Sequence, residues 1–226
     1  LHDPRVRVIS FTGSTEVGRK LLHSAADQVL KPAMELGGNA PLIVFEDADI
    51  DKAVAGAMLA KMRNLGEACT AANRFYVHEA VSQEFTSKFT AAMSALKMGN
   101  GLEDGIDVGP LVNADTRDKV AAFVADAVAK GARLELGGTL PNGKGYFYPP
   151  TVLSNVQETA DCVNDEIFGP VAAIQSFTDE DDVIRRANNT EYGLVAYVFS
   201  ENMKRAMQVC ERLEYGMVGL NRGLVS

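Results

Sequence analysis

Two hydrophobic periods alternate along the chain. Short runs rich in β-branched and aromatic residues predict strands at residues 6–11, 40–46, 74–78, 132–138, 151–156, 170–177, 194–200 and 216–221. Stretches with apolar residues every three or four positions predict helices between them, at residues 14–30, 47–65, 79–96, 114–131, 178–189 and 201–213. This alternation predicts an α/β fold with a mostly parallel, open twisted sheet and helices on both faces.

Signals at the helix ends refine these elements. Ser14 is a candidate N-cap for the first helix, and Thr178 and Asp181 have the spacing of a capping box. Gly66 lies just beyond the second helix, so Cys69 should fall on a loop before the next strand.

Composition narrows the classes of function. The 226 residues include 22 Lys and Arg against 30 Asp and Glu, a net charge of -8 without a basic stripe, which argues against a nucleic-acid partner. No apolar run approaches the roughly 18 residues of a membrane span, and the first residues lack a signal-peptide layout. We therefore expect a cytoplasmic protein with no membrane partner. A start at Leu1 rather than Met, and an end shortly after the last predicted strand, suggest a fragment.

Cys69 raises the question of a reactive thiol. The cysteines and histidines show neither disulfide nor metal-ligand spacing, so no metal is expected: Cys69, Cys162, Cys210, His2, His23 and His78. A free cysteine is usually a small buried apolar residue, whereas Cys69 stands in "GEACTAANR", among small residues on a predicted loop. Core filling and nucleophilic catalysis both remain open from the residues alone.

Three further sites could carry chemistry. Gly13 and Ser14 form a strand-to-helix turn whose backbone N–H groups would favour an anion, although most such turns bind nothing. Glu35 in "MELGGNAP" and Glu166 in "NDEIFGPV" lie beside apolar segments, where a carboxylate can become a general base, although most such acids only cap or pair.

Four of these stretches occur together in one order. "FTGSTEVG", "ELGGNAP", "GEAC" and "EIFGPV" resemble the aldehyde dehydrogenase superfamily, and the similarity runs over nearly the whole chain. Within it, "KMRNLGEAC", "LEYGMVGLN" and "GLVS" look most like succinate-semialdehyde dehydrogenases. The resemblance implies the catalytic-domain fold of that family, with residues 1–36 as the edge of a dinucleotide-binding domain and 37–226 as the catalytic domain.

The resemblance also implies roles for individual residues. Cys69 matches the catalytic nucleophile and Glu35 the general base, while Arg63 and Ser226 match the residues that hold a substrate carboxylate. A surface ion pair at the helix end remains the alternative for Arg63. The resemblance also implies contacts to NAD or NADP. Gly13 and Ser14 match the turn under the pyrophosphate and nicotinamide, and Leu36 would offer its carbonyl to the carboxamide. Glu166 matches the acid that holds the nicotinamide ribose, and Phe168 the aromatic residue beside that ring.

The implied activity is NAD(P)-dependent oxidation of an aldehyde, succinate semialdehyde first, through a cysteine thioester in a homo-oligomeric full-length enzyme. Glu67 replaces the usual Gln, and Ala71 stands where some relatives have a second cysteine. The family residues that bind the first half of the cofactor, and the Asn of the oxyanion hole, have no counterpart in this sequence. An inactive folded fragment or assembly module of such an enzyme is therefore one alternative. A coenzyme-A-acylating enzyme is the other, although Glu35 argues against it because such enzymes typically lack that acid.

Overall fold

The structure, a computed structural model, describes residues 1–225 and contains two compact units. The first unit is Leu1–Gly37 and the second is Gly38–Ser226. The boundary lies one residue beyond the position expected from the sequence. The assignment of the first unit to a dinucleotide-binding domain remains a prediction.

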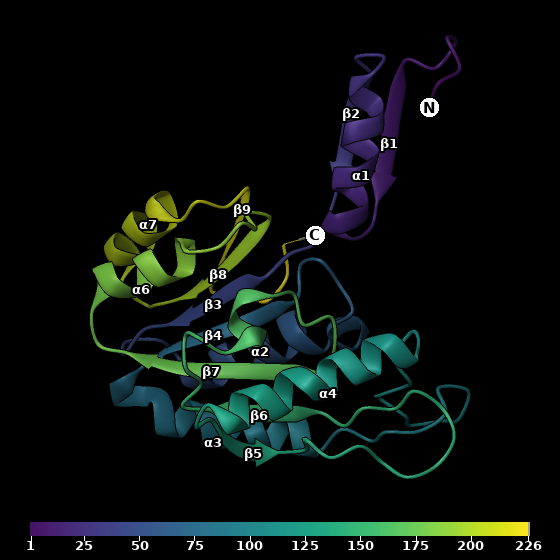
Figure 1. Ribbon diagram of the computed structural model, residues 1–226. Helices are drawn as coiled ribbons and strands as arrows, with labels where there is room; N and C mark the ends of the chain where they lie inside the picture. The colour runs from purple at the N-terminus through teal and green to yellow at the C-terminus, as the bar shows by residue number, and fades with distance from the viewer. Residues whose placement is uncertain (226) are drawn as a thin grey trace. The chain divides into compact units, whose positions relative to one another are not determined.

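The first unit is a strand–helix–strand motif (Figure 1). Strand β1 (Val8–Thr12) pairs in parallel with β2 (Lys31–Glu35), and helix α1 (Thr15–Ala26) connects them. Helix α1 ends before the predicted Leu30, and Val29 has a φ of 53°, outside the right-handed helical region. Strand β2 was not predicted from its sequence KPAME.

The second unit is built on a seven-stranded sheet (Figure 1). Its strands are β3 (Ala40–Val44), β4 (Ala72–His78), β5 (Arg133–Leu136), β6 (Thr151–Ser154), β7 (Val171–Phe177), β8 (Val195–Phe199) and β9 (Met217–Leu220). They lie in the order β5-β6-β7-β4-β3-β8-β9, and β5–β6 is the single antiparallel pair among the described residues. The predicted mostly parallel α/β sheet is confirmed.

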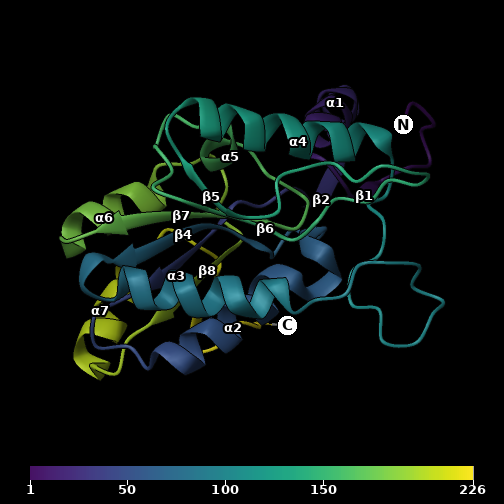
Figure 2. The same cartoon turned by 90° about the horizontal axis from the view of Figure 1, so that it is seen from below.

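Helices cover both faces of this sheet (Figure 2). They are α2 (Ile50–Met62), α3 (Glu79–Ser94), α4 (Ala114–Ala129), α5 (Asp161–Asn164), α6 (Glu180–Asn188) and α7 (Met203–Arg212), with a 3-10 turn η1 (Arg63–Gly66) after α2. The short helix α5 was not predicted. The capping prediction for α6 was wrong, because the N-cap is Asp179, whose carboxylate accepts from the backbone N–H of Asp182.

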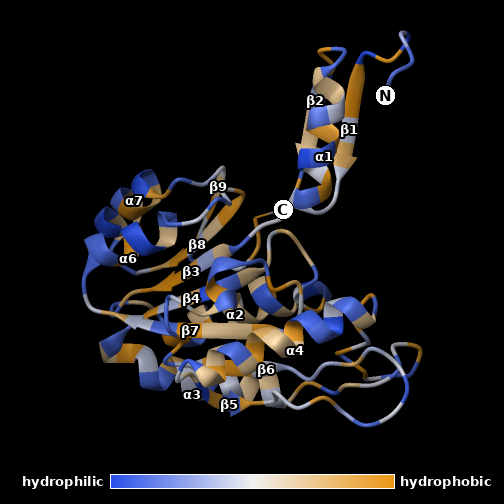
Figure 3. Cartoon of the chain, viewed as in Figure 1, coloured by the Kyte–Doolittle hydropathy of each residue, from blue (hydrophilic) through white to orange (hydrophobic). Residues whose placement is uncertain are grey.

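Side-chain alternation in the strands divides the core between the two faces. Leu42 packs in the cluster of α2 and α3, whereas the next residue, Ile43, packs with α6 and α7. A third cluster joins Val120 of α4 to Leu153 and Val171 of the sheet. Figure 3 colours β7 and β8 mainly as hydrophobic, while α6 and α7 carry many hydrophilic residues.

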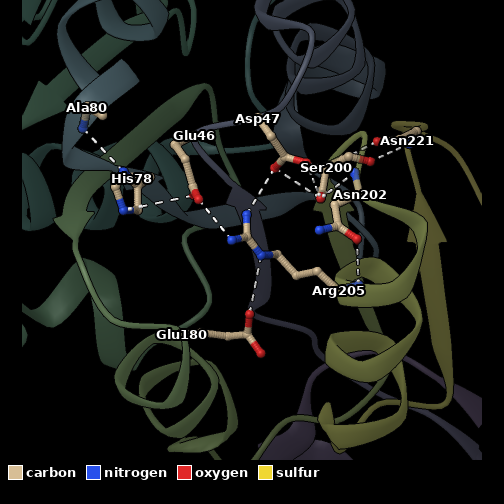
Figure 4. A network of polar contacts seen from close by, with 9 residues as sticks. All are labelled: Glu46, Asp47, His78, Ala80, Glu180, Ser200, Asn202, Arg205 and Asn221. Carbon is tan, nitrogen blue, oxygen red and sulfur yellow. Dashed lines mark hydrogen bonds and ion pairs between the residues drawn. The ribbon is translucent and has the colours of Figure 1, made fainter.

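A polar network joins the carboxyl ends of β3 and β8 to α7 (Figure 4). Arg205 lies 2.8 Å from a Glu46 carboxylate oxygen and 3.2 Å from one of Asp47. Ser200 Oγ and the Asn202 backbone N–H also donate to Asp47. These contacts fix the loops at the carboxyl ends of the strands.

No helix within residues 1–225 is both long enough and apolar enough to cross a bilayer. In the same residues, no three His, Cys, Asp or Glu side chains come together in a way that could hold a metal ion.

Candidate active site

Cys69 lies in the turn between η1 and β4, at the amino end of this central strand, and is half-buried. Asn64 has a φ of 52°, which takes the chain out of the direction of α2, and Asn is among the residues that tolerate this conformation best. Its Nδ2 donates to the Glu67 carbonyl at 2.7 Å, and Ala71 N donates to the Ala68 carbonyl at 3.0 Å. Cys69 is therefore held on a tight loop, as predicted.

Gly38 packs directly against the backbone of Cys69. A Cβ at Gly38 would lie 1.9 Å from the Cys69 carbonyl oxygen, so this approach requires glycine. The Gly38 N–H donates to Glu166 Oε1 at 2.9 Å. The second glycine of "ELGG" thus contacts both the turn of the predicted nucleophile and a predicted cofactor-binding carboxylate.

A cavity of about 260 Å³ adjoins Cys69. Its lining includes Arg63 at the end of α2, and Gly223 and Leu224 near the C-terminus. The structure therefore brings the predicted nucleophile and the predicted carboxylate-binding arginine to one cavity. Ser226, the other predicted substrate contact, lies outside the described residues.

Tyr197 of β8 is a member of this site that sequence reasoning missed. It lines the cavity, and its hydroxyl donates to the carbonyl of Thr70, the residue after Cys69, at 2.8 Å. Burial raises the pKa of the Tyr197 hydroxyl to about 12, so it remains a neutral donor at physiological pH. The sequence signal was a tyrosine inside a buried strand, because a buried phenol usually has a polar partner.

Glu166 and Phe168 lie on the segment that enters β7. Burial raises the pKa of the Glu166 carboxyl, while the Gly38 N–H and the charge of Lys119 favour its ionised form. The Gly38 N–H occupies Glu166 Oε1, and a carboxylate has further lone pairs with which to accept a second hydrogen bond. Phe168 has a φ of 54°, a strained conformation for an aromatic residue of the kind that clusters at functional sites.

The predicted site residues of the first unit also lie together. Ser14 Oγ accepts from Val17 N, so Ser14 is the N-cap of α1 as predicted. Gly13 N donates to the Glu35 carbonyl at 3.0 Å. The side chain of Leu36 packs against Gly18, where a Cβ would lie 2.5 Å from it. The predicted base therefore borders the predicted anion-binding turn.

Glu67, the departure from the usual Gln, has a structural partner. Its Oε1 accepts from the Val112 backbone N–H at 3.0 Å and so fixes the long loop before α4. An amide oxygen would accept the same bond, so this contact alone does not require a carboxylate.

Comparison with known proteins identifies the family. The sequence profile described as "Aldehyde dehydrogenase family" matches residues 1–226. The chain belongs to the aldehyde dehydrogenase family. This family assignment agrees with the resemblance of the four ordered motifs, and the role of Cys69 as nucleophile stays a prediction.

Similar aldehyde dehydrogenases include a succinate-semialdehyde dehydrogenase of Paenarthrobacter nicotinovorans, 56% identical over 100% of this chain and 50% of the relative. The NADP(+)-dependent succinate-semialdehyde dehydrogenase of Escherichia coli K12 is 47% identical over 99% of this chain and 46% of the relative. The crystal structure of succinate-semialdehyde dehydrogenase from Burkholderia pseudomallei superposes with a TM-score of 0.97 at 50% identity, covering 99% of this chain and 46% of the other. The chain spans about half the length of the curated relatives it matches.

Proposed function

We propose that the complete enzyme oxidises a short aldehyde with a carboxylate at its far end, succinate semialdehyde first, using NAD or NADP. The observation that carries this proposal is the cavity shared by Cys69 and Arg63. A guanidinium can hold a carboxylate through two parallel hydrogen bonds and thereby place the aldehyde end beside the thiol.

The names of the relatives support the same class of substrate. The relatives reported above are named for succinate semialdehyde, and a Pseudomonas putida relative, 49% identical over 98% of this chain and 46% of its own length, is named for glutarate semialdehyde. Succinate and glutarate semialdehydes both join an aldehyde to a carboxylate through a short chain. A cation at a fixed distance from Cys69 would select among such molecules by length.

The proposed chemistry divides the oxidation into two steps. Cys69 Sγ forms a bond to the aldehyde carbon, the hydride leaves that carbon, and a thioester remains on Cys69. Nicotinamide, when bound, supplies the hydride acceptor. The Cys69 backbone N–H is a candidate donor to the oxyanion. Glu35 is proposed to activate the water that hydrolyses the thioester, with the carboxylic acid and the free thiol as products.

Each unit, taken by itself, carries residues suited to part of a nicotinamide cofactor. Glu166 offers an acceptor oxygen, the group that binds a ribose hydroxyl, and the N-terminus of α1 at Gly13 and Ser14 suits a phosphate. Leu36 and Phe168 remain proposed contacts to the carboxamide and the ring. The cytoplasmic location and the homo-oligomer expected from the sequence also remain predictions.

The test compares two aldehydes with Arg63→Ala in a full-length enzyme that contains this chain. Loss of a charge-assisted contact costs about 1.5–3 kcal/mol, so kcat/KM for succinate semialdehyde should fall by roughly 10- to 150-fold. The kcat/KM for butanal, which has the same chain length but no carboxylate, should fall far less. Arg185→Ala on α6, whose side chain is 62% exposed, is the control and should leave both values near wild type. An equal loss for both aldehydes in Arg63→Ala would show that Arg63 is structural.

A further inference from the structure

A fully buried lysine lies beneath the candidate site. Lys61, in the last turn of α2, is 0% exposed. Its Nζ donates to Asn73 Oδ1 at 2.9 Å, the single hydrogen bond of this group within residues 1–225. Burial of an ammonium group is expensive, and lysines are almost never fully buried unless they are paired. Lys61 therefore calls for a reason beyond packing.

Contacts run from Lys61 to the site through Asn73. Asn73 Nδ2 lies 3.5 Å from the Gly38 carbonyl, at the long end of hydrogen-bond distances. The N–H of Gly38 is the donor to Glu166, and its Cα packs against the Cys69 carbonyl. The route from Lys61 thus reaches one glycine that contacts both the thiol-bearing turn and the carboxylate.

Lys61 Nζ also lies close to the backbone just before Cys69. Gly66, three residues before Cys69, has a φ of 76°, and a Cβ there would lie 3.1 Å from Lys61 Nζ and 2.3 Å from the Gly169 carbonyl oxygen. The Lys61 ammonium therefore lies next to the backbone of Gly66, which leads from α2 to Cys69.

The charged and titratable groups around Lys61 and Glu166 come from several elements. Burial lowers the pKa of Lys61 to about 7, and the negative charge of the nearby Glu166 opposes this shift. Burial raises the pKa of the Cys162 thiol to about 12, so this thiol is neutral near pH 7. Glu166 is also faced by Lys119 of α4 and by Tyr192, and both Lys119 and Lys61 favour its ionised form.

We propose that Lys61 is a positioning residue of this site: its ammonium holds Asn73 and, through Asn73, Gly38 in place, and it supplies positive charge near Glu166, the proposed acceptor for the cofactor ribose. The part that concerns the ribose rests on the function proposed above. The coupling between Lys61 and Glu166 does not, and it can be measured without any activity.

Lys61→Met separates this role from a purely structural one. Met has nearly the same length and removes the buried charge, but it leaves Asn73 Oδ1 without its donor, so the two effects on stability oppose each other. The matched control is Lys52→Met, on the same helix, where the lysine side chain is 67% exposed. We expect Lys61→Met to be a folded variant, which a cooperative melting curve by circular dichroism would show.

The decisive readout is the titration of Glu166 in the 226-residue chain. Carbon-13 NMR of labelled glutamate carboxyls, assigned by Glu166→Gln, follows its ionisation against pH. Lys61→Met should move the Glu166 midpoint to higher pH, because a neighbouring positive charge is lost, whereas Lys52→Met should not move it. An unchanged midpoint in a folded Lys61→Met chain would overturn the proposal.

A second readout addresses the cofactor in a full-length enzyme. Lys61→Met should raise the KM for NAD or NADP on the order of 10-fold at acidic pH, the loss expected for one charge-assisted hydrogen bond, and less at alkaline pH. A similar loss at every pH would contradict the electrostatic role. If the enzyme oxidises no aldehyde at all, the proposed function fails while the Glu166 titration still decides the role of Lys61.

Discussion

Gly38→Ala is the sharpest perturbation of the candidate site, because it adds one methyl group where the structure has no room. The new Cβ would lie 1.9 Å from the Cys69 carbonyl oxygen, whereas real Cβ contacts stay beyond 3.0 Å. Backbone atoms rather than a flexible side-chain end must therefore move by about 1 Å. Such a shift would disturb the 2.9 Å hydrogen bond from Gly38 N to Glu166.

The expected magnitude follows from these two effects. Overpacking typically costs about 1–3 kcal/mol, and a lost hydrogen bond to a charged group about 1.5–3 kcal/mol. A total of about 2.5–6 kcal/mol should lower the melting temperature by roughly 5–24 °C, at about 2–4 °C per kcal/mol for a chain of this size.

The assay is thermal unfolding by circular dichroism, with Gly109→Ala as the matched control. A Cβ at Gly109 would meet nothing within 4 Å, so this variant should be neutral or slightly stabilised, by up to about 1 kcal/mol. The alkylation rate of Cys69 by iodoacetamide should also change in Gly38→Ala and not in the control. Equal melting temperatures in the two variants would refute the close approach of Gly38 to the Cys69 turn.

Two further predictions concern Tyr197 and Lys61. Tyr197→Phe removes the hydrogen bond to Thr70, so it should lower the free energy of unfolding by about 1 kcal/mol and change the rate of Cys69 alkylation. Tyr146→Phe, at a tyrosine that is 44% exposed, is the control and should change neither quantity. Identical melting curves for the two variants would contradict the anchoring role of Tyr197. The pKa of Lys61 is lowered from 10.5 to about 7, so between pH 7 and 10.5 the unfolded chain binds a proton that the folded chain lacks, and stability should rise with pH. In urea unfolding at several pH values, the free energy of unfolding of the wild type should therefore increase across this window relative to that of Lys61→Met. A constant difference between the two free energies would contradict the buried charge.

Sequence pattern predicted the main strands because their own residues carry the signal. Ala40–Val44 and Val195–Phe199 are buried throughout, and such continuous apolar runs are typical of parallel strands covered on both faces. Lys31–Glu35 was missed because KPAME contains a proline and is mostly exposed, so its pairing with β1 leaves no apolar pattern. The N-cap of α6 was misplaced by one residue because Thr178 and Asp179 both suit that position.

The site was predictable where motifs name residues, and not where tertiary contacts define them. Arg63 and Cys69 came from local motifs, and the shared cavity then placed them together. In the sequence, Lys61 looks like an ordinary polar residue of a helix, because its buried partner Asn73 lies on strand β4 and cannot be inferred from the pattern of α2. Tyr197 reads as one more apolar strand residue until its hydroxyl is seen to meet the Cys69 turn.

The central claim is that Cys69 becomes acylated by a carboxylate-bearing aldehyde. Its most direct test is mass analysis of a full-length Glu35→Gln enzyme, acid-quenched after mixing with succinate semialdehyde and cofactor, because slowed hydrolysis should let the thioester accumulate. We predict a burst of reduced cofactor and a succinyl group on the peptide that contains Cys69, with Cys162 and Cys210 unmodified. A burst without acylation of Cys69, or a succinyl group on another cysteine, would contradict the account.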